Sequence, residues 1–187
     1  MNKNINIRNI TIVGLGVALN VVGAFIAMNL RLPIYMDSIG TIFIACLLGP
    51  RYAILTGVCG SIVSGITFDI YSLYFAPVQI STGLLAGIMY NKGFLKGIKT
   101  PIGVLIFTIP TSIISACIAA FLFGGITSSG SSYIVQILKT MGMPDVLSVF
   151  ITQVFTDYAD KFTGVGLVAL GVNALPKSLK SQIVVNK

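Results

Sequence analysis

Several residue types on which enzymes depend are scarce or absent in this sequence. It contains no histidine and only 5 acidic residues among 187. It has no phosphate-binding loop of the GxxxxGK[ST] kind, no paired cysteine motif and no acidic pair inside an apolar run. ATP hydrolysis, metal catalysis and nucleophilic catalysis each need residue sets of this kind. We therefore expect a chain that is not an enzyme and that holds no metal and no cofactor.

Charged residues are also sparse, whereas long hydrophobic runs are abundant. Only 9% of the residues are charged and 55% are hydrophobic, and the mean hydropathy is +0.95. An ordinary soluble domain has roughly a quarter of its residues charged. A helix of ~20 mostly apolar residues crosses the ~30 Å hydrocarbon core of a bilayer, so a chain of this length supplies about six such helices. The composition predicts an all-α integral membrane protein in contact with lipid, formed by a single membrane domain.

Apolar runs separated by proline, glycine and charge place these helices along the chain. We predict helices near residues 10–30, 38–50, 52–68, 77–91, 101–123 and 160–176. The segment 124–158 is predicted to form a long loop rich in glycine and serine, followed by a helix at the outer surface. An alternative is one long tilted helix over residues 145–175, but we favour a break at about Asp160.

The distribution of basic residues predicts the orientation of the chain in the membrane. With six crossings and the N-terminus inside, nine of the twelve basic residues lie in the cytoplasm. Only Arg31, Lys139 and Lys161 then face outward. The positive-inside rule therefore favours both termini in the cytoplasm. The net charge of +7 does not indicate nucleic-acid binding, because the basic residues lie between apolar runs and do not form one patch.

All five acidic residues fall on the outer side in this topology, next to aromatic and amide side chains. Polar groups beside hydrocarbon are costly unless they are paired, hydrated or used for binding. We therefore expect a small-molecule site at the outer face. The candidate binding residues are Asn29, Arg31, Tyr35, Asp37, Tyr71, Tyr74, Gln79, Gln153, Asp157 and Lys161.

Structural roles are open for several of these residues. Asp37 precedes an apolar run and is a candidate N-cap of the helix near 38–50. Asp160 and Lys161 are candidates for an ion pair at the membrane interface, and the tyrosines for an aromatic belt.

Small residues recur at a spacing of four along three predicted helices. Such stripes let helices approach closely in lipid, or they form a docking face for a partner. The stripes are Gly14 with Ala18, Gly23 with Ala27, Gly57 with Ser61 and Gly65, and Gly83 with Gly87.

Three stretches of the chain, in their order, resemble the substrate-binding S components of energy-coupling factor (ECF) transporters. They are LRLPIYMDSIGTIFIACLLGPRYAILTGVCGSIVSG (30–65), APVQISTGLLAGIMYNKG (76–93) and DYADKFTGVGLVALGVNALPKSL (157–179). The shared order is a proline-containing loop with Asp, a short helix ending in LGP, glycine-rich helices, and an Asp-Lys pair before a last helix that ends in LP.

The resemblance implies a six-helix subunit of the bacterial plasma membrane that captures a B-type vitamin or precursor outside the cell. The DSIGT and DK segments look closest to members that handle vitamin B6 or a thiamin-related pyrimidine. Two ATPase subunits and a membrane scaffold (T) subunit would power transport, and Gly14 and Ala18 match the small-residue pattern by which family members meet the scaffold.

Two other functions are compatible with a small polytopic protein. One is a membrane sensor or assembly module, and the other is a solitary secondary transporter. Copurification of ATPase subunits favours an S component, copurification of a kinase favours a sensor, and uptake into vesicles without ATP favours a solitary transporter.

Overall fold

The computed structural model describes residues 7–174, and this part of the chain contains helices and no strand. The helices are α1 (Ile7–Asn29), α2 (Ile39–Leu48), α3 (Pro50–Thr67), α4 (Tyr71–Tyr74), α5 (Ala76–Asn91), the 3-10 helix η1 (Gly97–Lys99), α6 (Thr100–Phe123), α7 (Ser131–Thr140) and α8 (Asp145–Ala174). The all-helical expectation is confirmed for the described residues.

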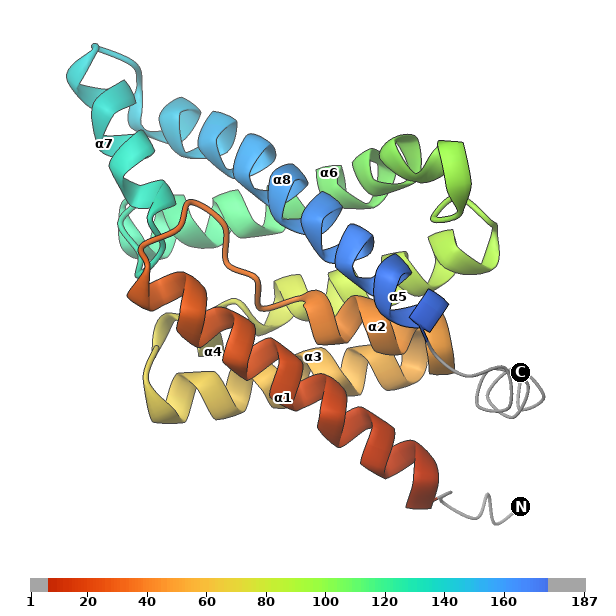
Figure 1. The fold of residues 1–187 in the computed structure, drawn as a ribbon. Coiled ribbons are helices and arrows are strands. Elements are labelled where there is room, and N and C mark those ends of the chain that lie inside the picture. The colour runs from red at the N-terminus through yellow and green to blue at the C-terminus, as the bar shows by residue number, and fades with distance from the viewer. Residues whose placement is uncertain (1–6, 175–187) are drawn as a thin grey trace.

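The long helices pack side by side in one bundle (Figure 1). α8 crosses the bundle diagonally, between α6 on one side and α2 on the other. The start of α1 and the end of α8 lie at the same end of the bundle, which we call the terminal end. The short helix α7 and the loop 30–38 lie toward the opposite end, which we call the α7 end.

Proline and glycine explain most of the helix boundaries. α3, α5 and α6 each begin with a proline in the first turn, where the missing N–H costs nothing. α2 and α3 are separated by Gly49, whose φ of +86° is accessible to glycine. The first five predicted helices, up to residue 123, are confirmed to within three residues at each end.

The predicted break at Asp160 is wrong, because α8 is one continuous helix of 30 residues. The charges at Asp157, Asp160 and Lys161 face the interior of the bundle from the middle of this helix. The glycine- and serine-rich loop is also shorter than predicted, since residues 131–140 form α7. Residues 175–176 of the predicted last helix lie outside the described residues, as do Lys3, Lys177, Lys180 and Lys187 of the topology count.

The bundle is apolar outside and partly polar inside, the reverse of a soluble protein. Large aliphatic side chains are exposed along α1 and α6, including Leu15, Val22 and Ile109. Many buried residues are hydroxyls, amides and carboxylates. By length and composition, Ile7–Asn29 and Gly97–Phe123 are candidate membrane spans, and Ile39–Leu48 is a shorter apolar helix. This pattern is the one expected of a protein whose surface contacts lipid.

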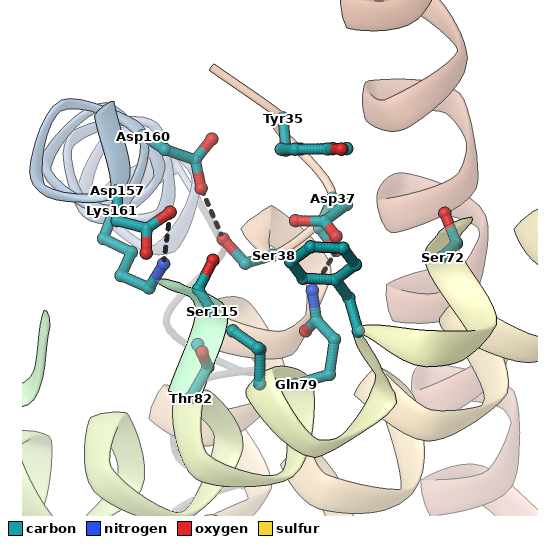
Figure 2. A pocket seen from close by; sticks show the side chains of 12 residues that line it. Tyr35, Asp37, Ser38, Ser72, Gln79, Thr82, Ser115, Asp157, Asp160 and Lys161 are labelled. Carbon is teal, nitrogen blue, oxygen red and sulfur yellow. Dashed lines mark hydrogen bonds and ion pairs between the residues drawn. The ribbon is translucent and has the colours of Figure 1, made fainter. Parts of the chain in front are cut away.

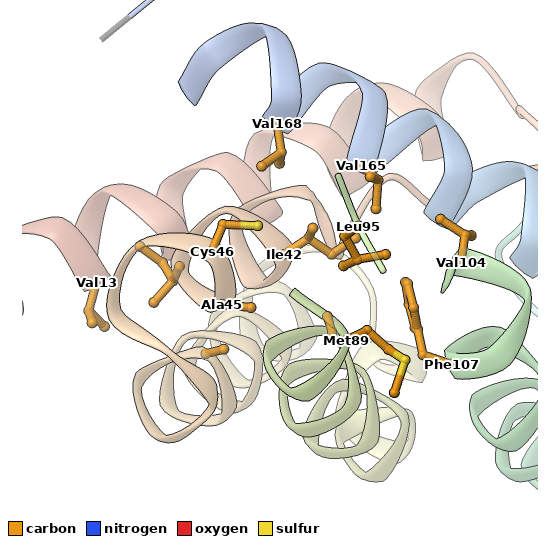
Figure 3. Close-up of a cluster of buried hydrophobic side chains, with 13 residues drawn as sticks. Val13, Ile42, Ala45, Cys46, Met89, Leu95, Val104, Phe107, Val165 and Val168 are labelled. Carbon is orange, nitrogen blue, oxygen red and sulfur yellow. The ribbon is translucent and has the colours of Figure 1, made fainter. Parts of the chain in front are cut away.

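A mainly aliphatic cluster, which we call the aliphatic core, fills the bundle at its terminal end (Figure 3). Phe107, Ile42 and Val104 are fully buried, and Val165 and Val168 of α8 lie against them. Side chains from α1, α2, α5, α6 and α8 therefore meet in one cluster and hold these helices together.

The small-residue stripes divide into inward and outward sets. A Cβ at Gly83 would lie 2.8 Å from the backbone of Ala53, and one at Gly23 would lie 2.2 Å from the carbonyl oxygen of Met36. These glycines therefore permit close packing within the bundle. A Cβ at Gly14 would meet nothing within 4 Å, and Gly14 and Ala18 both lie exposed on α1.

Candidate functional site

A small cavity lies beneath the loop 30–38, between α5, α6 and α8 (Figure 2). Its volume of about 20 Å³ is room for about one water molecule. Its lining combines carboxylates, one ammonium, hydroxyls, an amide and two aromatic rings. The lining residues are Tyr35, Asp37, Ser38, Ser72, Phe75, Val78, Gln79, Thr82, Ser115, Asp157, Asp160 and Lys161.

Asp160 fixes the loop 30–38 to α8. One carboxylate oxygen accepts a hydrogen bond from the backbone N–H of Met36 at 2.7 Å, and the other accepts one from the hydroxyl of Ser38 at 3.1 Å. Asp160 is 5% exposed, so both bonds are shielded from water. Hydrogen bonds to a charged group in such surroundings are among the stronger ones. Asp160 is therefore an anchor for the wall of the cavity.

Asp157 and Lys161 lie one turn apart on α8 and face the same cavity. The Lys161 ammonium is 3.8 Å from one oxygen of Asp157, and both residues are buried. The other oxygen of Asp157 is buried without a hydrogen-bond partner among the described residues. The pair is therefore only partly satisfied within the protein.

Asp37 occupies the loop side of the cavity, opposite this pair (Figure 2). Burial, and after it the negative charge of Asp160, raises the pKa of Asp37 to about 7. Burial likewise raises the pKa of the neighbouring Tyr35 hydroxyl. Asp37 thus changes charge near neutral pH, whereas an ordinary aspartate is fully ionised there.

The N-terminus of α2 is capped from another helix. Asn20 of α1 accepts hydrogen bonds from the backbone N–H groups of Gly40 and Thr41, at 2.7 and 3.1 Å. These are amides that an N-cap side chain normally satisfies. The alternative that Asp37 caps this helix is therefore wrong, since Ser38 is the N-cap residue and makes no side-chain cap bond.

The same network continues from Asn20 to the cavity. The Asn20 amide donates to the Thr41 hydroxyl at 2.8 Å, and Thr41 donates to the Gln79 side-chain carbonyl at 2.9 Å. The Gln79 amide donates in turn to the backbone carbonyl of Asp37 at 3.2 Å. α1, α2 and α5 are therefore joined by buried polar bonds that end at the cavity wall.

Two segments far apart in the sequence close over the cavity. The Tyr35 hydroxyl donates to Thr127 at 3.1 Å, and the N–H of Gly130 donates to the carbonyl of Leu32 at 3.0 Å. Arg31 adds a hydrogen bond to the Tyr133 hydroxyl. The segments 30–38 and 124–133 are thus bonded to each other at the α7 end.

Aromatic rings form one side of the site. The centroids of Tyr35 and Phe75 are 6.1 Å apart with their planes inclined by 34°. Phe123 lies beyond Phe75, and the rings of Tyr71 and Tyr74 meet it edge-on. A flat ligand ring would find apolar contact against Tyr35 and Phe75.

The structure brings five of the ten candidate binding residues together and leaves five outside the cavity lining. Those in the lining are Tyr35, Asp37, Gln79, Asp157 and Lys161. Of the others, Asn29 bonds to its own helix, Arg31 lies with Tyr133, Tyr71 and Tyr74 contact Phe123, and Gln153 is buried in α8.

Other lining residues were not on the candidate list. Thr82, Ser72 and Ser115 are small hydroxyls within or beside apolar runs, where the sequence offers no signal that distinguishes them from packing residues. Asn20 was not on the candidate list either, although an amide inside an apolar helix is costly in lipid unless it is bonded, and this signal could have found it.

The described residues contain no group of three His, Cys, Asp or Glu side chains that could hold a metal ion. Asp37, Asp157 and Asp160 line one cavity. Asp157 pairs with Lys161, however, and Asp160 accepts hydrogen bonds from Met36 and Ser38. The arrangement has the chemistry of a binding site for an organic molecule with polar groups and a flat ring.

Comparison with known proteins gives one family. The model of the family described as ECF transporter, substrate-specific component, matches residues 8–108, which span α1 to the first third of α6. No curated protein and no solved structure matches the chain. The matched residues cover more than half of the sequence and include the loop 30–38, Gln79 and Thr82. The chain therefore belongs to the substrate-specific components of ECF transporters.

Proposed function

We propose that this subunit captures a B-type vitamin or vitamin precursor at the outer face of the bacterial plasma membrane, and that vitamin B6 or a thiamin-related pyrimidine is favoured. The cavity carries this proposal. In a bundle with an apolar surface, three carboxylates and one ammonium from the loop 30–38 and α8 meet beside two aromatic rings. Buried charge of this kind is retained in membrane proteins for binding or transport.

The orientation proposed is six crossings with both termini in the cytoplasm. The start of α1 and the end of α8 share one end of the bundle, as an even number of crossings requires. Arg8, Arg51 and Lys96 also lie toward this end, at the start of α1, the start of α3 and the α5–α6 connection. Single cysteines can be placed at Lys96 and Tyr133 in a background without the native cysteines. In intact cells an impermeant maleimide should label Tyr133→Cys and should not label Lys96→Cys. Labelling of Lys96→Cys in intact cells would contradict this orientation.

Capture requires the cavity to widen, because its volume of about 20 Å³ is far below the several hundred Å³ typical of small-molecule sites. The movable wall in this proposal consists of residues 30–35, which precede the anchored Met36, and of the segment 124–133. They meet through hydrogen bonds at Tyr35, Leu32 and Arg31, whereas the opposite walls are continuous helices. Separation of these segments would admit a ligand from the α7 end.

Binding can be measured on the purified protein in lipid nanodiscs, by calorimetry and by thermal shift, with a panel of B vitamins and their precursors. One compound should bind in a one-to-one ratio. Tyr35→Ala and Gln79→Ala should each weaken it by about tenfold or more, the loss expected for one good polar or aromatic contact. Gly166→Leu is the matched control, because this glycine lies exposed on α8 with nothing near its Cβ position. If no compound of the panel gave a calorimetric signal or a thermal shift, the proposal would be contradicted.

The exposed pair Gly14 and Ala18 is proposed as the face that meets the scaffold subunit. Leucine at either position should fit the isolated protein, since both residues are exposed, but should hold a partner helix away. Gly14→Leu or Ala18→Leu should therefore keep vitamin binding and abolish uptake in cells that contain the ATPase and scaffold subunits. Gly166→Leu should keep both. Normal copurification of the scaffold with Gly14→Leu would refute this assignment.

A further inference from the structure

The cavity has an excess of negative charge. Asp37, Asp157 and Asp160 face a single ammonium, that of Lys161, which leaves a formal charge of −2 when all four groups are ionised and −1 when Asp37 is protonated. Asp157, Asp160 and Lys161 are between 3% and 8% exposed. Uncompensated charge at such depth is costly, because water cannot solvate it and the surrounding helices are apolar.

The carboxylates of Asp160 and Asp157 differ in how well the protein satisfies them. Both oxygens of Asp160 have a donor, the N–H of Met36 and the hydroxyl of Ser38. Asp157 has only Lys161, at 3.8 Å from one oxygen. Its second oxygen is buried and has no donor within the described part of the chain. A carboxylate oxygen without a donor loses the hydrogen bonds it would have in water.

A second unpartnered group points into the same place. The hydroxyl of Thr82 lines the cavity from α5, is in a residue 1% exposed, and has no hydrogen-bond partner among the described residues. Figure 2 shows Thr82 beneath Ser115, on the side of the cavity where Asp157 and Lys161 project from α8. The site therefore presents one carboxylate oxygen and one hydroxyl that bond to no other group among the described residues.

A hydrogen-bond donor with a positive charge would satisfy both requirements. It would supply the missing donor to Asp157 and would reduce the excess negative charge. A neutral hydroxyl would supply the donor but would leave the negative charge unchanged, and an anionic ligand would increase that charge. The rings of Tyr35 and Phe75 favour a flat ring beside that donor and attract a cation over their faces.

We propose that the substrate is a nitrogen heterocycle that carries a protonated amino group, and that this group donates to the free oxygen of Asp157 while the ring lies against Tyr35 and Phe75. The proposal rests on the proposed capture function and specifies its ligand class. Asp157 acts as the acceptor of the charged group, and Thr82 as an acceptor or donor for a second polar substituent. Asp160 keeps its role as the anchor of the loop.

Two matched pairs of compounds test the ligand class on the unmodified protein. The first pair is pyridoxamine and pyridoxine, which differ by an aminomethyl group in place of a hydroxymethyl group. The second is 4-amino-5-aminomethyl-2-methylpyrimidine and 4-amino-5-hydroxymethyl-2-methylpyrimidine, which differ in the same way. The aminomethyl member is the amino compound of each pair, because only its side-chain amine is protonated at pH 7. Calorimetry in nanodiscs at pH 7 should give at least tenfold tighter binding of the amino compound in one pair.

Asp157→Asn tests the assigned contact, since asparagine keeps the size of the side chain and removes its charge. The preference for the amino compound should disappear in this variant, so that the two compounds of the pair bind with about equal affinity. Asp145→Asn is the matched control on the same helix: Asp145 is 77% exposed and pairs with Lys139 away from the cavity, so the preference should persist.

The outcomes separate this proposal from the function on which it rests. Equal or tighter binding of the neutral member of whichever pair binds would overturn the cationic ligand class and leave vitamin capture standing. An unchanged preference in folded Asp157→Asn would overturn the contact. If no vitamin or precursor binds at all, the capture function itself fails, and this proposal fails with it. The comparison within each pair uses the unmodified protein, so it decides the ligand class even where the variant does not fold.

Discussion

The two ends of the helix bundle are built from the same helices but enclose different chemistry. Toward the α7 end, α5 contributes Gln79 and Thr82 to the cavity. About two turns later, the same helix contributes Ala86 and Met89 to the aliphatic core. α8 changes in the same way, from Asp157 and its neighbours to the valines of the core.

This difference shows how a small membrane protein can combine stability with a polar site. The buried members of the aliphatic core are all apolar side chains. The cavity carries three carboxylates, one ammonium and two buried side-chain oxygens that have no partner among the described residues, so it contributes less to stability than apolar packing of the same volume would. Changes in the core should therefore affect stability and leave binding intact, and changes in the cavity should do the opposite unless they release the loop 30–38.

The largest expected effect is on stability, from a change in the core. Phe107→Ala removes a fully buried ring and should lower the free energy of unfolding by about 4 kcal/mol. The affinity of the folded protein for its ligand should be unchanged, because Phe107 does not line the cavity. Thermal unfolding and calorimetry on the same preparation check both parts. A large loss of affinity in folded Phe107→Ala would show that the two ends are not independent.

A smaller loss of stability, with loss of binding, is expected from the anchor of the loop. Asp160→Ala leaves the N–H of Met36 and the hydroxyl of Ser38 without acceptors. The free energy of unfolding should fall by about 3 kcal/mol, the cost of two hydrogen bonds to a charged group. Ligand affinity should fall by about a hundredfold or more, because the loop carries Tyr35 and Asp37.

Asp145→Ala is the control for this change, since it removes an exposed aspartate from the same helix. The free energy of unfolding and the ligand affinity of Asp145→Ala should both equal those of the wild type within experimental error. Unaltered affinity in Asp160→Ala would mean that the loop keeps its position without its anchor.

The smallest expected effect, when taken per pH unit, is a pH dependence that belongs to the cavity end alone. The pKa of Asp37 is raised to about 7, first by burial and then by Asp160, while Lys161 opposes the shift. The folded protein therefore binds a proton at Asp37 between about pH 4 and pH 7 that the unfolded chain has released. Stability should fall as the pH rises toward 7, by at most about 1.4 kcal/mol per pH unit, and should level off above it.

The absence of histidine makes this dependence measurable, because no other side chain ordinarily titrates between pH 5 and 8. Melting temperatures at pH 5, 6, 7 and 8 should decline and then level in the wild type and in Asp145→Asn. Asp37→Asn should flatten the curve. The same slope in Asp37→Asn would assign the titration to another group, with Asp157 and Asp160 the nearest candidates.

The sequence predicted the helices well where breaker residues mark their ends. Prolines at positions 50, 77 and 101 and glycine at 124 delimit α3, α5 and α6, and these local signals do not depend on what the helices contact. It left open whether one helix continues through the charged residues of α8, and we favoured a break, because the same charges fit either a membrane interface or a cavity inside the bundle.

The candidate site was predictable in part for a similar reason. Asp37, Gln79 and Lys161 are polar residues beside apolar runs, so the sequence marks them as unusual. The capping of α2 by Asn20 was not predictable, since it depends on the contact between two helices in space. Residues such as Tyr74 were marked by type alone, and the fold places that ring outside the cavity, 51% exposed.

Mass spectrometry of the small molecules retained on the purified protein tests the central claim most directly. We predict one vitamin-sized compound per protein in the wild type and in Gly166→Leu, and its loss from Tyr35→Ala. Equal retention of the compound in folded Tyr35→Ala, or its absence from a wild type that also binds no vitamin or precursor, would contradict the account.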